Sequence, residues 1–139
     1  MRRLVLLPLL AVLAVGCATS PLPDADDPVD NGLRAVWTAF QDAVRTDDTD
    51  AIEALVDPDA SEYTAALITE VTSADDQFKA DILATRAQQL TAQDDGRYLF
   101  RQEYTYTDDL GNTTESGYYV YFRVAEDGRA YLAEFQAAG

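Results

Sequence analysis

The chain has 139 residues, of which 47% are hydrophobic, and it carries 25 acidic side chains against 10 basic ones, a formal net charge of −15. It contains no histidine and one cysteine. This composition excludes a zinc site built from cysteine and histidine, a catalytic unit with a histidine base and a disulfide within one chain. We expect no metal and no cofactor, and the acidic charge disfavours nucleic-acid binding.

The N-terminus has the features of a secretory signal. Arg2 and Arg3 precede an apolar run, Leu4–Val15, which is shorter than the ~20 residues that a membrane-spanning helix needs. Its length is typical of the apolar segment of a signal peptide. The small residues before Cys17 resemble the bacterial lipoprotein signal, which implies that residues 1–16 are removed and that Cys17 is lipidated. The alternative is an ordinary secretory signal with an incidental cysteine.

The lipoprotein resemblance also implies a location. The protein is expected in the cell envelope, anchored to a membrane by the lipid on Cys17. Ala18 follows the cysteine, where an aspartate favours retention in the inner membrane, so the resemblance points to the periplasmic side of the outer membrane. Several acyl chains on one residue hold a protein to a membrane far more firmly than a single chain does.

The charged residues are unevenly chosen. Aspartate supplies most of the acid, and Lys79 is the only lysine. Such a composition resembles the surfaces of proteins from salt-loving organisms. In molar salt the Debye length is about 3 Å, so the repulsion between acidic side chains is screened. We therefore expect a halophilic source.

The chain divides into three parts. Residues 1–16 form the signal peptide, and residues 17–31, which hold three prolines among aspartates, are predicted to form an extended tether. One domain, residues 32–139, follows, and it is long enough to build a single core without disulfides.

The first half of the domain predicts helices. Apolar residues recur at helical spacing from Leu33 to Val44, which predicts a helix that ends near Thr46. Asp50 is expected to cap a second, short helix, which Asp57-Pro58 ends.

Two further helices are expected. Ser61 or Asp59 caps the third, which carries the stripe Tyr63, Leu67 and Val71. Apolar residues from Phe78 to Leu90 mark the fourth, which is expected to end before residues 94–96.

The hydrophobic period changes from helix to strand at Arg97. Residues 98–106, 118–124 and 129–136 alternate between two faces and predict an antiparallel meander of three strands. The complete prediction is an α+β domain in which N-terminal helices pack on a curved antiparallel sheet of at least three strands.

The two turns decide which side chains face the helices. A two- or four-residue loop in the first hairpin buries Arg101 and Glu103, whereas the three-residue loop Asp109-Leu110-Gly111 sends them to the opposite face, so we predict the latter. For the second hairpin a two-residue loop, Asp127-Gly128, is expected. The residues then expected to face the helices are Tyr98, Phe100, Val120, Phe122, Val124, Tyr131, Ala133 and Phe135, with Tyr131 opposite Val124 and Ala133 opposite Phe122.

The order of elements resembles the nuclear transport factor 2-like superfamily, a cone of helices against a bent sheet. The residues that carry this likeness are Val36-Trp37-Thr38-Ala39-Phe40, Asp57-Pro58 and Asp127-Gly128-Arg129. The resemblance implies either a non-catalytic binding domain or an isomerase- or dehydratase-like enzyme with a carboxylate in the cone. Asp81 or Glu70, with a tyrosine as donor, would supply that carboxylate.

The aromatic residues give the candidate binding site. Seven of the eight tyrosines lie between Tyr98 and Tyr131. The candidates for lining a pocket that binds a small apolar ligand are Trp37, Tyr98, Phe100, Tyr104, Tyr118 and Tyr131. The alternative is that these rings only fill the core. Tyr119 and Tyr121 face outward and are candidates for a homodimer interface on the outer sheet face, and the alternative is that they form ordinary cross-strand pairs. Another envelope protein is also an expected partner, with no residues assigned to it.

Overall fold

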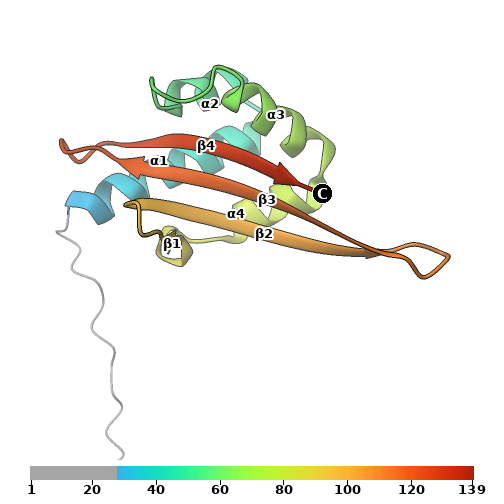
Figure 1. Ribbon diagram of the computed structural model, residues 1–139. Coiled ribbons are helices and arrows are strands. Elements are labelled where there is room, and N and C mark those ends of the chain that lie inside the picture. The colour runs from blue at the N-terminus through green and yellow to red at the C-terminus, as the bar shows by residue number, and fades with distance from the viewer. Residues whose placement is uncertain (1–27) are drawn as a thin grey trace, which may run out of the picture.

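The computed structural model describes residues 28–139, so the signal peptide, Cys17 and the tether up to residue 27 lie outside the described residues. Helices pack on one face of a curved, four-stranded antiparallel sheet with strand order β1-β2-β3-β4 (Figure 1). The predicted α+β class, with helices preceding the sheet, is confirmed. None of the helices in this part of the chain combines the length and apolarity that a membrane span requires.

The elements follow one another in the predicted order. Their bounds are α1 Pro28–Thr46, α2 Thr49–Leu55, α3 Thr64–Ala74, α4 Asp76–Ala84, the short 3-10 helix η1 Ala87–Gln89, β1 Thr91–Ala92, β2 Arg97–Thr107, β3 Thr113–Val124 and β4 Ala130–Ala138. The first helix begins at Pro28, inside the range assigned to the tether, because proline is well suited to the first turn of a helix. With the short strand β1 the sheet has four strands, in agreement with the prediction of at least three, although β1 itself was not among the strands located in the sequence.

Two predicted helix caps are wrong. Asp48, not Asp50, caps α2: its carboxylate accepts a hydrogen bond from the Ala51 amide at 3.0 Å. The residue that precedes α3 is Tyr63, and no side chain caps that helix. The difference at α2 arises because the chain leaves α1 in a tight turn, with Asp47 in the left-handed region at φ 53°.

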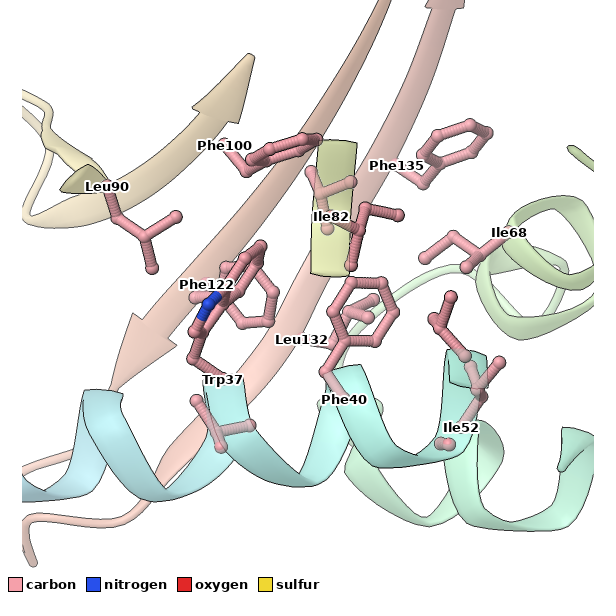
Figure 2. Close-up of a cluster of buried hydrophobic side chains, with 14 of the residues drawn as sticks. Trp37, Phe40, Ile52, Ile68, Ile82, Leu90, Phe100, Phe122, Leu132 and Phe135 are labelled. Atoms are coloured by element: carbon pink, nitrogen blue, oxygen red, sulfur yellow. The ribbon is translucent and has the colours of Figure 1, made fainter. Parts of the chain in front are cut away.

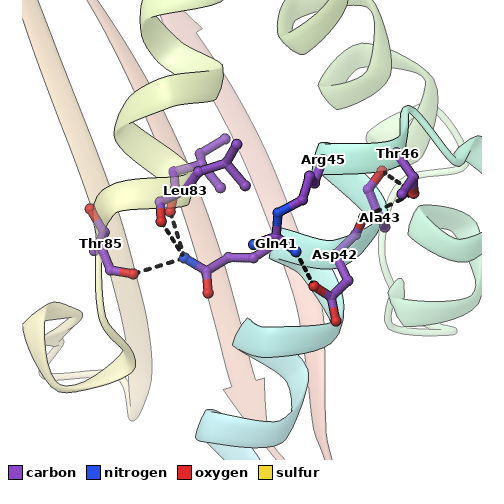
Figure 3. Close-up of polar contacts among 8 residues, drawn as sticks. Gln41, Asp42, Ala43, Arg45, Thr46, Leu83 and Thr85 are labelled. Atoms are coloured by element: carbon purple, nitrogen blue, oxygen red, sulfur yellow. Dashed lines mark hydrogen bonds and ion pairs between the residues drawn. The ribbon is translucent and has the colours of Figure 1, made fainter.

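The fourth helix ends at Ala84 and not at Leu90. The side-chain amide of Gln41 donates to the carbonyl oxygens of Ile82 and Thr85, each at 2.8 Å (Figure 3). The indole N–H of Trp37, one turn earlier on α1, also donates to the Thr85 carbonyl at 3.0 Å. These donors satisfy carbonyls that a longer helix would use internally, and Leu90 is buried from the connecting segment instead.

The first strand connection has the predicted loop. The Asp108 amide donates to the Asn112 carbonyl at 2.9 Å, and Gly111 has φ 83°, so residues 109–111 form a three-residue loop that ends on a left-handed glycine. Phe100 pairs with Val120 and both are buried, while Arg101 and Glu103 are exposed. The predicted assignment of faces in this hairpin is confirmed.

The predicted register of the second hairpin is wrong by one residue. The Ala125 amide donates to the Arg129 carbonyl at 2.7 Å, and Gly128 has φ 80°, so this loop also has three residues. Tyr131 therefore pairs with Arg123 and not with Val124.

The core side of β4 is occupied by a different residue than expected. Leu132, which is fully buried, takes the place opposite Phe122 that Ala133 was expected to fill. An irregularity between Tyr121 and Phe122 then shifts the register, so that Phe135 pairs with Val120 and is buried as predicted.

Aromatic rings fill the space between α1 and the sheet. Trp37 lies 5.4–5.7 Å, between ring centroids, from Phe40, Phe100 and Phe122 (Figure 2). Full burial of each large apolar side chain contributes roughly 1.5–3 kcal/mol, so this cluster dominates the stability of the domain. All buried members of the cluster lie between Leu33 and Phe135.

Candidate functional site

Two of the six candidate pocket residues are part of the packed core. Trp37 is 1% exposed and Phe100 is 4% exposed. The Trp37 ring is enclosed by other aromatic rings, and its only polar atom is bonded to the Thr85 carbonyl. Their rings therefore act as core packing in this conformation.

Tyr104 and Tyr118 lie at the end of the sheet that is nearest the start of α4. The Tyr118 ring packs 4.4 Å from Phe78, between centroids, and 5.8 Å from Tyr104. The Tyr104 hydroxyl donates to the Asp81 carboxylate at 3.0 Å. Burial, followed by the hydrogen bond to Asp81, raises the pKa of Tyr104, and burial with the nearby Asp75 charge raises the pKa of Tyr118.

The two candidate acids occupy different environments. Glu70 is exposed on α3 and does not point into the interior. Asp81 is half-buried on α4, and its two carboxylate oxygens accept bonds from Tyr104 and from the Gln77 side chain. The structure thus brings one predicted acid to a tyrosine hydroxyl, at the rim of the domain.

The hollows around these residues are open surface grooves. Tyr98 contributes to a groove of about 460 Å³ beside the β3–β4 turn. Tyr104 contributes to one of about 380 Å³ where β2 and β3 pass the C-terminal end of β4, with Tyr119 and Gly139 also in its lining. Tyr131 borders a groove of about 670 Å³ between α1 and the β3–β4 turn, although it pairs with Arg123 and its ring lies on the same face of the sheet as that side chain. Within the described part of the chain, Tyr98, Tyr104 and Tyr131 therefore border three different grooves.

The outer face of the sheet is the second candidate surface. All four α-helices lie on the other side, and no described element covers it (Figure 1). Because Phe122 faces the core, its neighbours Tyr121 and Arg123 face outward. By the same alternation and strand pairing, this face carries three tyrosines and three arginines, namely Tyr119, Tyr121, Tyr131, Arg97, Arg101 and Arg123.

Polar contacts tie this outer face together. The Arg97 guanidinium lies 4.3 Å from the centre of the Tyr121 ring and reaches across it to Glu134 on β4, at 2.6 Å. The Tyr119 hydroxyl donates to Glu103 at 3.1 Å. Hydrogen bonds from Gln136 and Arg97 lower the pKa of Glu134. The face therefore presents tyrosine rings held in fixed positions by charged neighbours.

Arg101 differs from the other two arginines of this face. Arg97 is paired with Asp95 and Glu134, and Arg123 is paired with Asp57. Arg101 is exposed and forms no ion pair with any residue of the described part of the chain. Its charge is available to a binding partner.

The sequence pattern located only part of this face. It assigned Tyr119 and Tyr121 outward, but the one-residue error in the second hairpin placed Tyr131 in the core. The missed signal is a repeat: Asp95-Gly96-Arg97 and Asp127-Gly128-Arg129 form the same turn, in which the arginine amide and Nε both donate to the aspartate. Recognition of one of these turns in the sequence would have predicted the loop length of the other.

The described residues contain no group of three or more histidine, cysteine, aspartate or glutamate side chains that could hold a metal ion. Comparison of the chain with protein-family models, with curated proteins and with solved structures finds no match.

Proposed function

We propose that this protein is a non-catalytic, protein-binding domain of the cell envelope, tethered through a lipid on Cys17, and that the outer face of its sheet is the binding surface. The observation that carries the proposal is the uncovered set of three tyrosines and three arginines in a chain of net charge −15. Tyrosine and arginine are enriched at the energetic centres of protein interfaces.

The packing of the interior supports a protein partner over a small apolar ligand. The rings that would line a ligand pocket, Trp37 and Phe100, are in contact with each other and with Phe122. By contrast, the tyrosines of the outer face are already held by Arg97 and Glu103, so little conformational entropy is lost when a partner binds them.

Affinity capture from the envelope of the source organism tests the binding surface. The full-length protein, Tyr121→Ser and the matched control Tyr63→Ser are compared, because Tyr63 is a solvent-exposed tyrosine, 63% exposed, on the helical side. We expect the same partner with wild type and Tyr63→Ser, and a loss of at least tenfold with Tyr121→Ser. Equal recovery in all three removes the outer face as the binding surface.

Metabolic labelling with a fatty-acid probe tests the anchor separately. The wild-type chain should incorporate label and Cys17→Ala should not. Undiminished label in Cys17→Ala contradicts lipidation at that residue and leaves the binding surface untouched.

The alternative is an isomerase- or dehydratase-like enzyme, and the Asp81–Tyr104 hydrogen bond is the observation in its favour. A carboxylate and a tyrosine hydroxyl are both groups that can transfer protons in general acid–base catalysis. Saturable binding of an apolar fluorescent probe that changes in Asp81→Asn, and not in the exposed control Asp76→Asn, supports the enzyme. No saturable binding counts against it.

A further inference from the structure

The edge of the sheet formed by β2 has no hydrogen-bonded neighbour strand over about half of its length. β1 pairs only with Tyr98 and Leu99 of β2, so from Arg101 to Thr107 this strand has a neighbour on one side only, β3. The Asp108 amide points toward β3 and donates to the Asn112 carbonyl. The Arg97 carbonyl points the other way, toward β1, and accepts from the Gln93 amide. In an antiparallel ladder these directions alternate, so the free backbone groups are those of Arg101, Glu103, Thr105 and Thr107.

This edge lacks most of the features that usually prevent pairing with another chain. Natural edges are protected by proline, by charged side chains and above all lysine, by a bulge or by a covering segment. Arg101 and Glu103 are the only charged residues of this edge segment, and their charges are opposite. The opposite edge of the sheet is covered: Val56 bridges to Leu132, and the Asp57 amide donates to the Leu132 carbonyl at 2.8 Å. Residues 101–107 contain no proline or lysine, their pairing with β3 is regular, and residues 104–107 alternate tyrosine and threonine, which favour strands.

The segment also projects beyond the helices. Every residue from Thr105 to Glu115 is exposed, so the end of the β2–β3 hairpin has no helix against either face (Figure 1). Tyr106 is 54% exposed and Leu110, in the loop, is 86% exposed. A second chain can therefore approach the edge without displacing any described element.

We propose that this edge of β2 pairs, antiparallel, with the same edge of a second copy of the chain, so that two sheets join into one. The pairing is centred on Tyr104. It places Glu103 opposite Thr105 and Arg101 opposite Thr107 of the other copy, so all four residues with free backbone groups find hydrogen-bond partners.

Charge favours a second copy at this edge. The segment 101–107 holds one arginine and one glutamate, so it is locally neutral in a chain of net charge −15. The segment itself therefore brings no net charge into the contact between two acidic chains, and the register places no like charges of residues 101–107 opposite each other. Salt screens the remaining repulsion, so the dimer is expected to strengthen as sodium chloride is added.

Length also favours a second copy. The free segment is bounded at one end by β1, which pairs with Leu99, and at the other by the loop that begins after Asp108. In the proposed register the free segments of the two copies coincide along their whole length, so neither copy leaves part of its edge unpaired.

The first test uses a fragment of residues 28–139, which holds every member of the buried core cluster. Thr105→Pro removes an amide that points away from β3, so the β2–β3 ladder is kept, and Thr105→Val is the control that keeps the amide. In sedimentation experiments we expect a concentration-dependent dimer for wild type and Thr105→Val, and at least tenfold weaker association for Thr105→Pro with an unchanged circular dichroism spectrum.

The second test does not depend on the proline variant. The fragment has no cysteine, because Cys17 is the only one in the chain. A mixture of Glu103→Cys and Thr105→Cys should form the mixed disulfide in preference to either homodimer, whereas Glu115→Cys, on β3 away from this edge, should not cross-link.

Three outcomes overturn the proposal. The first is a fragment that remains monomeric at every protein and salt concentration. The remaining partner for the edge would then be an extended segment of another protein. The second is a dimer that Tyr121→Ser abolishes and Thr105→Pro does not, which places the contact on the outer sheet face. The third is a Glu115→Cys variant that forms disulfide-linked dimers in the same yield as the mixture of Glu103→Cys and Thr105→Cys.

Discussion

Arg123, on the outer face of β3, donates through Nε to the buried carboxylate of Asp57 at 2.6 Å, and its Nη2 forms an ion pair with the same oxygen at 2.5 Å. The Asp57 side chain is 4% exposed and that of Arg123 is 42% exposed. Asp57 also lies beside the edge of β4, where its amide donates to the Leu132 carbonyl. The pair therefore fastens the connection between α2 and α3 to the sheet and fixes one arginine of the proposed binding face.

Arg123→Met should destabilise the domain by about 2 kcal/mol, because it leaves the Asp57 carboxylate buried without its cation. Chemical unfolding of residues 28–139 measures the change. Arg129→Met is the matched control: its ion pair with Asp127 is solvent-exposed, so its loss should have no measurable effect. Equal stability of the two variants would show that the Asp57 pair contributes nothing.

Gln41→Met should destabilise the domain by about 1–2 kcal/mol. The substitution keeps the size of the side chain but removes the donor to the Ile82 carbonyl and one of the two side-chain donors to the Thr85 carbonyl at the end of α4. Hydrogen exchange should become faster in the last turn of α4 before it changes in the sheet. Gln88→Met, at an exposed position of the 3-10 helix, serves as control, and the same loss in both variants would contradict the capping role.

Gly32→Ala tests the contact between α1 and the β3–β4 turn. Helix propensity alone would make this change stabilising by about 1 kcal/mol. However, a Cβ at this position would lie 2.0 Å from the Gly128 carbonyl oxygen, so we expect a net loss of about 1–3 kcal/mol. Ala39→Gly, at an exposed position of the same helix, should lose about 1 kcal/mol. A gain in stability for Gly32→Ala would show that the two segments are not in contact.

Arg97→Met should raise the pKa of Glu134 toward its usual value of 4.5, because Arg97 is one of the two donors that lower it. Because the pKa of Glu134 is lower in the folded chain than in the unfolded chain, the ionised carboxyl stabilises the fold at pH values above its unfolded-state pKa. This contribution is lost as the pH falls through the folded-state pKa. The variant should therefore lose less stability than wild type on acidification below pH 4.5. Nuclear magnetic resonance titration reads the carboxyl directly, with Arg101→Met, which has no ion pair in the described part of the chain, as control.

Added sodium chloride should raise the melting temperature of the isolated domain. The chain has a formal net charge of −15, and screening reduces the repulsion that opposes the compact state. Sodium sulfate also strengthens hydrophobic burial, so chloride is the appropriate salt. A melting temperature independent of sodium chloride would contradict the halophilic interpretation.

Local patterns predicted most of the fold because they report which face of an element is apolar. The alternation from Tyr98 to Tyr104 and the glycine at Gly111 together determined the first hairpin. The second hairpin failed because Asp127-Gly128 suits a two-residue loop and also the end of a three-residue loop, and the irregularity near Phe122 restored the alignment at Phe135.

Other features depend on residues that are distant in the chain. The end of α4 is set by donors from Trp37 and Gln41 on α1, which no local pattern contains. The composition of the outer face likewise depends on the register of β4. The predicted site residues were therefore correct in type, while their arrangement required the three-dimensional structure.

Photo-crosslinking in living cells is the most direct test of the proposed binding face. A photoreactive phenylalanine derivative replaces Tyr121 on the outer face, or Tyr63 on the helical side as control, in the full-length protein. A discrete crosslinked species to another envelope protein should appear from position 121 and be absent from position 63. Crosslinking that is the same from both positions, or absent from position 121, would contradict the assignment.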